Sequence, residues 1–203
     1  MDARRRIGLL GLGLLFLGCL PVRAEGAYGT PVTLPDRKTA KLETVRNGDL
    51  VLVATWSKGA LTWRPRTVYF SQGLGPVPKG ERGAQVIFLT TERGELVISR
   101  SQLFLMPSGK LKAASKLTPK DQLVDEAGHP VAIRRVTIAQ FQGGLHHISV
   151  EVDKAAPYEG HLLIWNGIVC GDYHLQLHGS DLEKLGLLEK AATAPEIGNP
   201  YLD

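Results

Sequence analysis

Short apolar runs separated by glycine-rich turns make up most of the chain. The runs are rich in β-branched and aromatic residues, which fit the half-buried surface of a strand. Clusters of Gly, Asn, Ser and Pro between them are typical of turns. This spacing predicts an all-β sandwich or barrel. Strands are predicted over residues 50–54, 66–70, 84–89, 95–98, 102–105, 131–138, 145–152 and 161–165.

Residues 172–178 alternate between apolar and polar side chains, which predicts one more strand. On that strand His174 and His178 would lie on one face about 13 Å apart, too far to share a metal ion. If the segment were a helix, their i, i+4 spacing would suit a metal. From the strand geometry we expect no metal site, and no motif predicts a cofactor.

The C-terminal residues change to a helical pattern. Residues 180–183 (Ser-Asp-Leu-Glu) form a capping box, and leucines follow at positions 182, 185 and 188. This predicts one amphipathic helix over residues 181–192, which Gly186 weakens, followed by an extended tail. We expect the helix to cover an exposed edge of the sheet.

A weak internal repeat relates residues 41–52 to residues 113–124, at an offset of 72 positions. Each copy has an apolar residue four before an aspartate, a turn, and then an apolar strand. One duplication of this kind predicts two related β subdomains about a pseudo-twofold axis.

The first 24 residues are typical of a signal peptide. Arginines occupy positions 4–6, and the apolar stretch over residues 7–20 is shorter than the ~20 residues that span a bilayer. Small residues at Val22 and Ala24 predict cleavage after Ala24 and a secreted or periplasmic location. The alternative is a lipoprotein, since residues 16–19 (Phe-Leu-Gly-Cys) resemble a lipobox that would anchor the chain through Cys19.

Removing the leader changes the charge and cysteine counts. Its four arginines and one aspartate supply +3 of the formal net charge of +4. The nearly neutral remainder predicts no nucleic-acid partner, and it has no apolar stretch that predicts a transmembrane helix. Without Cys19, only Cys170 remains, in an apolar run that favours a buried, unreactive thiol.

Five segments together resemble the hedgehog/intein (Hint) domains, over about residues 29–177. Residues 29–32 (Gly-Thr-Pro-Val) resemble the opening Gly-Thr-x-Val of the family, and residues 166–172 (Asn-Gly-Ile-Val-Cys-Gly-Asp) resemble its closing segment. Residues 45–52 and 117–124 resemble the two Gly-Asp segments. Residues 94–104 resemble the strand and loop that bear the family's Thr-x-x-His. The resemblance implies a Hint-like pseudo-twofold β fold.

The resemblance also implies self-processing chemistry. In the family a first Cys or Ser attacks the preceding peptide carbonyl, while the Thr and His of Thr-x-x-His polarise that bond and protonate the departing amine. A closing His-Asn then cleaves the downstream bond in inteins, and hedgehog-type domains transfer the ester to another nucleophile.

Most of that machinery is replaced in this chain. Residues 25–28 (Glu-Gly-Ala-Tyr), where the nucleophile is expected, hold neither a thiol nor an aliphatic hydroxyl. Ser99 matches the Thr, and Gln102 matches the His; an amide cannot shuttle a proton near neutral pH. Gly171 and Asp172 match the closing His-Asn.

We therefore interpret the chain as a degenerate Hint-like domain. The expected organisation is a signal peptide (1–24), a Hint-like β domain of two subdomains (25–179), and a C-terminal helix and tail (180–203). The expected function is that of an exported binding or structural module rather than an enzyme, with partner and oligomeric state open. One alternative is residual autoproteolysis; another is a secreted ligand-binding β module. The candidate catalytic remnants are Ser99, Gln102, Asp172 and Cys170.

Overall fold

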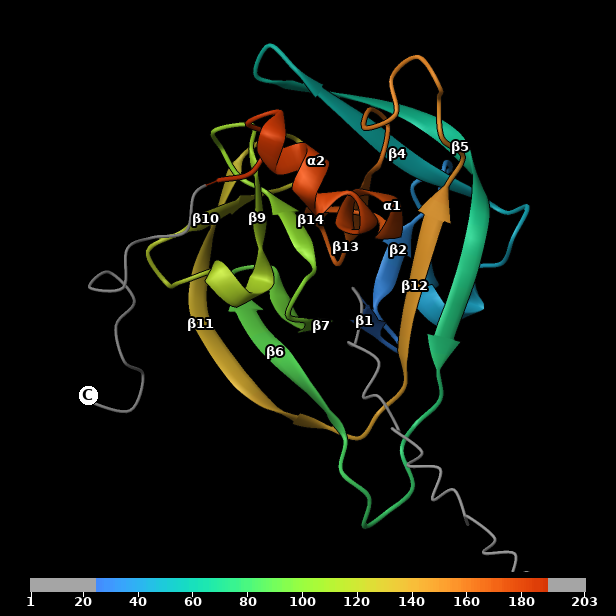
Figure 1. The fold of residues 1–203 in the computed structure, drawn as a ribbon, viewed down its shortest axis with the longest axis vertical. Helices are drawn as coiled ribbons and strands as arrows, with labels where there is room; N and C mark the ends of the chain where they lie inside the picture. The colour runs from blue at the N-terminus through green and yellow to red at the C-terminus, as the bar shows by residue number, and fades with distance from the viewer. Residues whose placement is uncertain (1–24, 190–203) are drawn as a thin grey trace, which may run out of the picture.

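A computed structural model describes residues 25–189, and strands dominate this part of the chain. The sheet has 14 strands along the path β10-β11-β6-β7-β1-β12-β5-β4-β13-β14-β8-β9, with β2 and β3 attached through β13. In Figure 1 the long strands β5 and β12 form one side of the molecule, and β6 and β11 form the other. The prediction of an all-β fold is confirmed. The predicted signal peptide and residues 190–203 lie outside the described residues.

The elements are numbered in chain order. The strands are β1 (Gly26–Ala27), β2 (Pro31–Thr33), β3 (Thr39–Lys41), β4 (Leu50–Ser57), β5 (Ala60–Leu74), β6 (Ala84–Thr91), β7 (Gly94–Ser99), β8 (Leu103–Leu105), β9 (Leu111–Ala113), β10 (Gln122–Val124), β11 (Pro130–Phe141), β12 (Leu145–Val150), β13 (Leu162–Trp165) and β14 (Ile168–Gly171). The helical segments are the 3₁₀ turns η1 (Leu42–Thr44) and η2 (Ala114–Lys116), and the helices α1 (Tyr173–Leu177) and α2 (Gly179–Lys184).

Each run predicted as a strand up to residue 165 coincides with an observed strand. The repeat predicted β10, but the pattern missed β1, β2, β3, β9 and β14. The first four have only two or three residues, which are too few to show a period of two. These short strands are set by pairing partners elsewhere in the chain. For example, Gly26 pairs with His146 of β12 and Ile98 of β7.

The internal repeat is visible in the bounds of the elements. Adding 72 to the residue numbers of β2, β3 and η1 gives the bounds of β8, β9 and η2. The strand that follows the turn, β4 or β10, also begins at matching positions. The chain therefore builds the same strand–strand–turn–strand unit twice, as expected for two halves related by a pseudo-twofold axis.

The turn that ends each unit is closed by an aspartate at the matching position. The Oδ2 atom of Asp49 accepts a hydrogen bond from the backbone N–H of Arg46 at 2.7 Å. In the second copy, Oδ2 of Asp121 accepts from the N–H of Thr118, also at 2.7 Å. This local hydrogen bond explains why an aspartate follows the turn in both copies. Its short side chain brings a carboxylate oxygen within reach of the backbone N–H, which stabilises the turn before the strand begins.

The core lies between the two halves and draws buried side chains from both. Leu42 and Val45 come from the first unit, and Ala114 and Leu117 stand at matching positions of the second. Trp165 on β13 is the largest of the fully buried side chains and belongs to the same cluster. The two units are held together by this shared apolar cluster, because each alone would leave its half of the cluster in water.

The prediction of a strand over residues 172–178 is wrong, because this segment forms the helix α1. Oδ1 of Asp172 accepts a hydrogen bond from the N–H of Leu175 at 3.2 Å, so Asp172 is the N-cap of the helix. A side-chain cap of this kind satisfies an N–H group that has no partner within the helix. The alternating sequence is compatible both with a strand and with a helix of one and a half turns. Only the cap at Asp172 distinguishes the helix from the strand.

The C-terminal helix is shorter than predicted and begins earlier. α2 begins at Gly179, so Ser180 is inside the helix and not its cap, and the helix has ended before Gly186. Gly186 has a φ of +68°, and its N–H donates to the carbonyl of Glu183, while the N–H of Leu187 donates to that of Leu182. This is a Schellman motif, which ends a helix at a residue with positive φ.

The segment after α2, and not the helix itself, covers a sheet edge. The strand β9 is the last on its side of the sheet path. Its residue Leu111 donates to the carbonyl of Leu187 and accepts from the N–H of Glu189, both at 2.8 Å. These bonds satisfy polar backbone groups that an open edge would expose to other chains.

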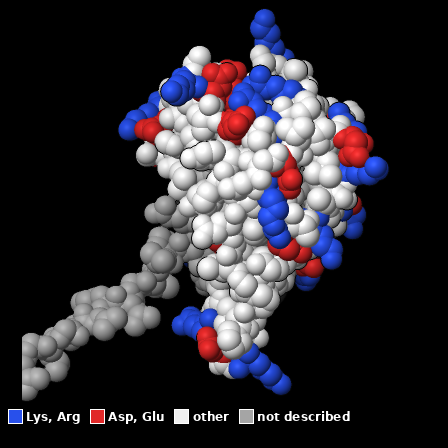
Figure 2. All heavy atoms as spheres, turned by 90° about the vertical axis from the view of Figure 1, so that its right-hand side faces the viewer, with Lys and Arg blue, Asp and Glu red and all other residues white. Residues whose placement is uncertain are grey.

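The surface carries mixed charges. Figure 2 shows Lys and Arg side chains next to Asp and Glu side chains, with uncharged surface between them, on the face that includes β5. None of the helices among residues 25–189 has the length and apolar character needed to cross a membrane. The absence of a nucleic-acid partner stays a prediction.

The turn at Gly109 is predicted to depend on its glycine more than the turn at Gly128. Both have positive φ, +80° and +87°, but a Cβ on Gly109 would lie 2.2 Å from Nε1 of Trp56, whereas a Cβ on Gly128 would meet nothing within 4 Å. Gly109→Ala should therefore lower the free energy of unfolding by about 1–3 kcal/mol more than Gly128→Ala, because overpacking adds to the shared backbone strain. Urea denaturation of both variants measures the difference, and equal losses would contradict the contact with Trp56.

Candidate functional site

Ser99, the last residue of β7, holds the backbone at the start of the described chain. Its Oγ accepts a hydrogen bond from the N–H of Glu25 at 2.9 Å, and its own N–H donates to the carbonyl of Glu25 at 2.8 Å. Ser99 is fully buried, and its Oγ also lies 3.4 Å from Oγ of Ser101. The peptide nitrogen that Ser99 binds therefore belongs to the bond between Ala24 and Glu25.

Gln102 is fully buried, and its side chain links β8 to the end of β14 by hydrogen bonds. Its amide nitrogen donates to the carbonyls of Gly171 at 2.7 Å and Leu103 at 3.2 Å. Its amide oxygen accepts from the side-chain nitrogen of Gln176 on α1, at 2.9 Å. Both donors and the acceptor are thus engaged in holding the backbone, which an amide can do and a proton shuttle would not require.

Asp172 is fully buried, and protein donors surround its carboxylate. Oδ2 accepts from the N–H of Val150 at 3.0 Å and the hydroxyl of Ser149 at 3.4 Å, and lies 2.8 Å from Nδ1 of His161. Oδ1 caps α1 through Leu175. This carboxylate joins β12, β13 and α1, because His161 directly precedes β13.

Cys170 takes no part in this network. It pairs with Leu163 and Phe104 on the neighbouring strands, belongs to the main apolar cluster, and is fully buried. Burial raises the pKa of its thiol well above the ordinary value, and the negative charge of Asp172 raises it further. A thiol that stays protonated and has no access to solvent is a poor nucleophile.

A second ionisable pair, absent from the sequence prediction, lies next to Ser99. Nδ1 of His147, on β12, is 3.3 Å from Oε1 of Glu25, and both side chains are almost fully buried. The His147 ring stacks on Tyr173 with centroids 4.1 Å apart, and on Phe70 at 5.4 Å. The sequence offered one signal for this pair, since two adjacent histidines, His146 and His147, lie in a fully buried strand.

Two polar atoms of this pair have no hydrogen-bond partner although they are buried. They are Oε2 of Glu25 and Nε2 of His147. A buried polar group without a partner costs about 1–3 kcal/mol relative to a satisfied one. The site around Glu25 therefore retains unused hydrogen-bonding capacity, which the apolar parts of the core do not have.

The structure thus brings three of the four sequence-predicted residues together. Ser99 binds Glu25, and Glu25 contacts His147. Helix α1 contacts the His147 ring through Tyr173 and is hydrogen-bonded to Gln102 and Asp172. Cys170 lies on the neighbouring strand and faces the core. The arrangement contains a hydroxyl that binds a peptide nitrogen, and the residue that carries this nitrogen has a buried carboxylate.

The histidines on α1 lie closer together than the sequence analysis predicted. Because residues 173–177 are helical, the ring centroids of His174 and His178 are 4.4 Å apart instead of about 13 Å. Even so, no three or more His, Cys, Asp or Glu side chains within residues 25–189 are grouped so as to hold a metal ion. The expectation of no metal site was therefore argued from a strand where the structure has a helix.

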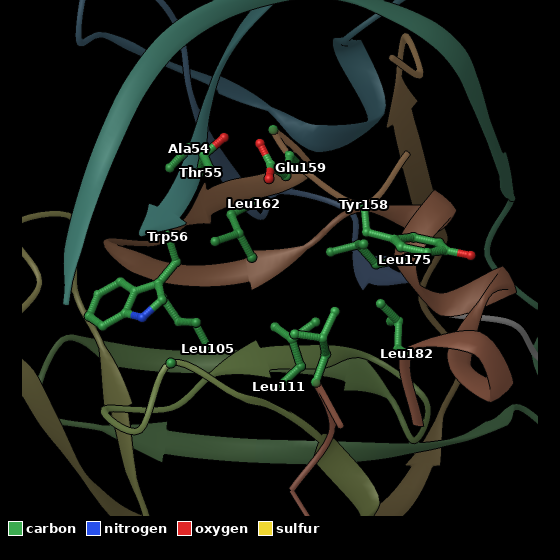
Figure 3. A pocket seen from close by; sticks show the side chains of 13 residues that line it. Ala54, Thr55, Trp56, Leu105, Leu111, Tyr158, Glu159, Leu162, Leu175 and Leu182 are labelled. Carbon is green, nitrogen blue, oxygen red and sulfur yellow. The ribbon is translucent and has the colours of Figure 1, made fainter. Parts of the chain in front are cut away.

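An apolar pocket of about 200 Å³ opens beside the helices. Figure 3 shows Trp56 at one end and Tyr158 at the other, with leucines 105, 111, 162, 175 and 182 between them. Gly109 and Leu187 also line it, and the rest of the lining consists of Ala54, Thr55, Glu159 and Gly160. The leucines between Trp56 and Tyr158 belong to a second apolar cluster, separate from the one around Trp165. A ligand in the pocket would therefore contact side chains from β4, β8, β9, β13 and both helices.

Comparison with solved structures identifies the fold. A bacterial intein-like domain from Clostridium thermocellum has a TM-score of 0.59 and 14% identity, covering 73% of this chain and 97% of that domain. A DnaB intein from Synechocystis sp. PCC 6803 gives 0.57 and 14%, covering 73% and 98%. The gp41-1 intein gives 0.53 and 19%, covering 73% and 98%. No family model and no curated protein matches.

These similarities agree with the antiparallel sheet and the doubled unit described above. The chain has the Hint-like pseudo-twofold β fold that the sequence segments suggested. Identities at this level establish the fold and leave the activity to be argued from the residues of this chain.

His146, next to the Glu25–His147 pair, is held in its neutral form. Its Nε2 lies 2.8 Å from Oγ of Ser71, and its ring is almost fully buried. Burial, together with the neighbouring charges of His147 and Arg46, lowers the pKa of His146 from 6.5 to about 4. The folded protein therefore binds a proton at this site less readily than the unfolded chain.

This difference predicts a loss of stability in mild acid. Below pH 6.5 the unfolded chain takes up the proton at His146 and the folded protein does not, so the free energy of unfolding should fall until about pH 4. His146→Gln should reduce this fall, whereas His129→Gln, at an exposed histidine, should leave it unchanged. Urea midpoints measured from pH 7 to pH 4 test the prediction, and parallel curves for His146→Gln and the unsubstituted protein would contradict it.

Proposed function

We propose that this protein is an exported Hint-like module that has lost self-processing and acts by binding. One observation carries the loss of processing. The peptide nitrogen bound by Ser99 belongs to Glu25, and in this proposal Glu25 stands in for the attacking residue. A carboxylate that attacked the preceding carbonyl would form an anhydride, which is less stable than the amide it replaces, so no useful ester or thioester results.

The other substitutions support the same proposal. A self-processing site must protonate the departing amine, and the amide of Gln102 cannot supply a proton near neutral pH. Both its donors already bind carbonyls, of Gly171 and Leu103. Cys170 offers no substitute nucleophile, because its thiol is buried in the core and remains protonated.

Export fits the same junction. Cleavage of the proposed signal peptide after Ala24 would break the bond whose nitrogen Ser99 binds. In the resulting chain Glu25 would begin with a free amine, which can donate to Ser99 as the amide N–H does. In this proposal a leader peptidase cleaves the bond between Ala24 and Glu25, which the domain itself does not cleave. Ser99 then binds the new N-terminus.

The proposal predicts that the bond between Ala24 and Glu25 survives when no peptidase acts on it. An unrelated soluble domain fused ahead of residues 21–24 should stay attached for days, with or without added thiol, because the site lacks a nucleophile. Intact-mass measurements of the fusion follow the bond directly. A fragment pair divided before Glu25 would instead establish residual autoproteolysis and overturn the proposal.

A double variant tests whether the site lacks only a nucleophile and a proton donor. Glu25→Cys combined with Gln102→His returns a thiol and an imidazole to positions that Ser99 already organises. We expect this fusion to release its carrier when thiol is added, and Ser99→Ala in the same background to slow that release. The same mass measurement applies, with Glu25→Cys alone as the control.

The apolar pocket favours a ligand-binding role for the module. Its volume of about 200 Å³ would accept one aromatic ring or a branched aliphatic group, since an engineered cavity of about 150 Å³ in another protein binds benzene. Trp56 and Tyr158 form its two ends and present flat apolar faces. This observation, rather than the fold, supports binding as the function.

Toluene is a suitable probe of this pocket. We expect it to shift the NMR signal of the Trp56 indole in a saturable manner, because the ring would displace water from an apolar wall. Leu187→Trp should block the effect by filling the pocket, whereas Leu185→Trp, outside the lining, should not. Shifts that do not saturate, or that persist in Leu187→Trp, would count against binding at this site.

A further inference from the structure

The apolar pocket has one acidic side chain in its wall. Among the 13 lining residues, all from the described part of the chain, Glu159 is the one carboxylate, and there is no Lys, Arg or His. Figure 3 shows Glu159 beside Ala54 and Thr55, across from Leu111 and Leu182. Glu159 is exposed, and a carboxylate in contact with water is negatively charged near neutral pH. The wall therefore offers a charge to one end of a ligand and apolar carbon to the rest of it.

The loop between β12 and β13 fixes Glu159 at the rim of the pocket. The next residue, Gly160, is buried and has a φ of +70°. A Cβ on Gly160 would lie 2.9 Å from Nη2 of Arg64, so this guanidinium lies against the backbone of the loop. At the start of the loop, Arg66 donates to the carbonyl of Glu151 at 3.0 Å. The backbone that carries the carboxylate is thus held near both of its ends.

The negative charge of Glu159 is not neutralised within residues 25–189. Its carboxylate forms no salt bridge and no hydrogen bond with another side chain of this part of the chain. The carboxylate at the other end of the pocket, that of Asp181, accepts from the hydroxyl of Tyr158 at 3.4 Å and pairs with Lys184 at 3.2 Å. Glu159 is therefore available to a cation from outside the chain, whereas Asp181 is already paired.

We propose that the pocket binds a small organic ammonium ion that carries one aromatic ring or one branched aliphatic group. This inference rests on the proposed binding role of the pocket and adds the charge of its ligand. The ammonium group pairs with Glu159 at the rim, and the apolar group lies among the leucines between Trp56 and Tyr158. A cation near the face of either aromatic ring gains a further electrostatic attraction.

The same wall disfavours an anion of equal shape. A ligand carboxylate would lose water and would face Glu159, with no cationic side chain in the lining to offset the repulsion. Arg64 contacts the backbone of Gly160 and is not itself a lining residue. The expected order of affinity is therefore cation, then neutral molecule, then anion.

Three probes that carry the same aromatic ring test this order. Near neutral pH, 2-phenylethylamine is a cation, 2-phenylethanol is neutral and phenylacetate is an anion. Titrations followed by the NMR signal of the Trp56 indole should show saturable shifts with the amine and the alcohol. At low salt we expect the amine to bind about fivefold more tightly than the alcohol, because an ion pair at an exposed rim contributes modestly. Phenylacetate should bind more weakly than either.

A conservative variant identifies the charge responsible. Glu159→Gln keeps the shape of the side chain and removes its charge, so the amine and the alcohol should then bind about equally. Glu183→Gln is the matched control, because it removes an exposed carboxylate of α2 that does not line the pocket. Salt gives a second readout without a variant. At about 1 M salt, where the Debye length is ~3 Å, the preference for the amine should fall below about twofold, while the alcohol still binds.

The outcomes separate this inference from the proposed function. Equal affinities for the amine and the alcohol, or a preference for the amine that survives Glu159→Gln, would overturn the inference and leave the pocket as a site for apolar ligands. Tighter binding of phenylacetate would assign the selection to Arg64 and overturn it as well. If none of the three probes produces a saturable shift, both the inference and the proposed binding role fall.

Discussion

The buried carboxylate of Asp172 is the group on which the rest of the site depends. A charge with no exposure to water is stable only if protein donors replace the water, and Asp172 receives them from β12, from His161 and from the first turn of α1. The same contacts begin the helix. Without this carboxylate there is no N-cap at residue 172, and the side chains that α1 carries to the site lose their support.

The polar residues near Glu25 are engaged in contacts with the backbone. Ser99 binds the peptide nitrogen of Glu25, and Gln102 donates to the carbonyl of Gly171. A histidine in place of Gln102 could not make the same three bonds, since an imidazole has two nitrogens and the amide uses two donors and an acceptor. These bonds join Glu25 to β7, and they join β8 to β14 and α1.

Helix α1 carries side chains into three clusters. Tyr173 stacks on His147 beside Glu25, His174 stacks on His161, and Leu175 lines the apolar pocket. Successive residues of a helix point in different directions, so five residues suffice to reach all three. A strand at the same place would send these residues to only two faces.

Most strands and the doubled unit could be predicted from the sequence, because apolar periodicity and an offset of 72 are local or repetitive signals. The match of Ser99 and Gln102 to the family's Thr-x-x-His could also be read from the sequence alone. The two-residue strand β1, the pairing of His147 with Glu25, and the neutral state of His146 could not, since each depends on segments about 70 to 120 residues away. The helix at residue 173 shows the limit most clearly: its alternating sequence allows a strand, and burial of Asp172 against β12 and His161 selects the helix.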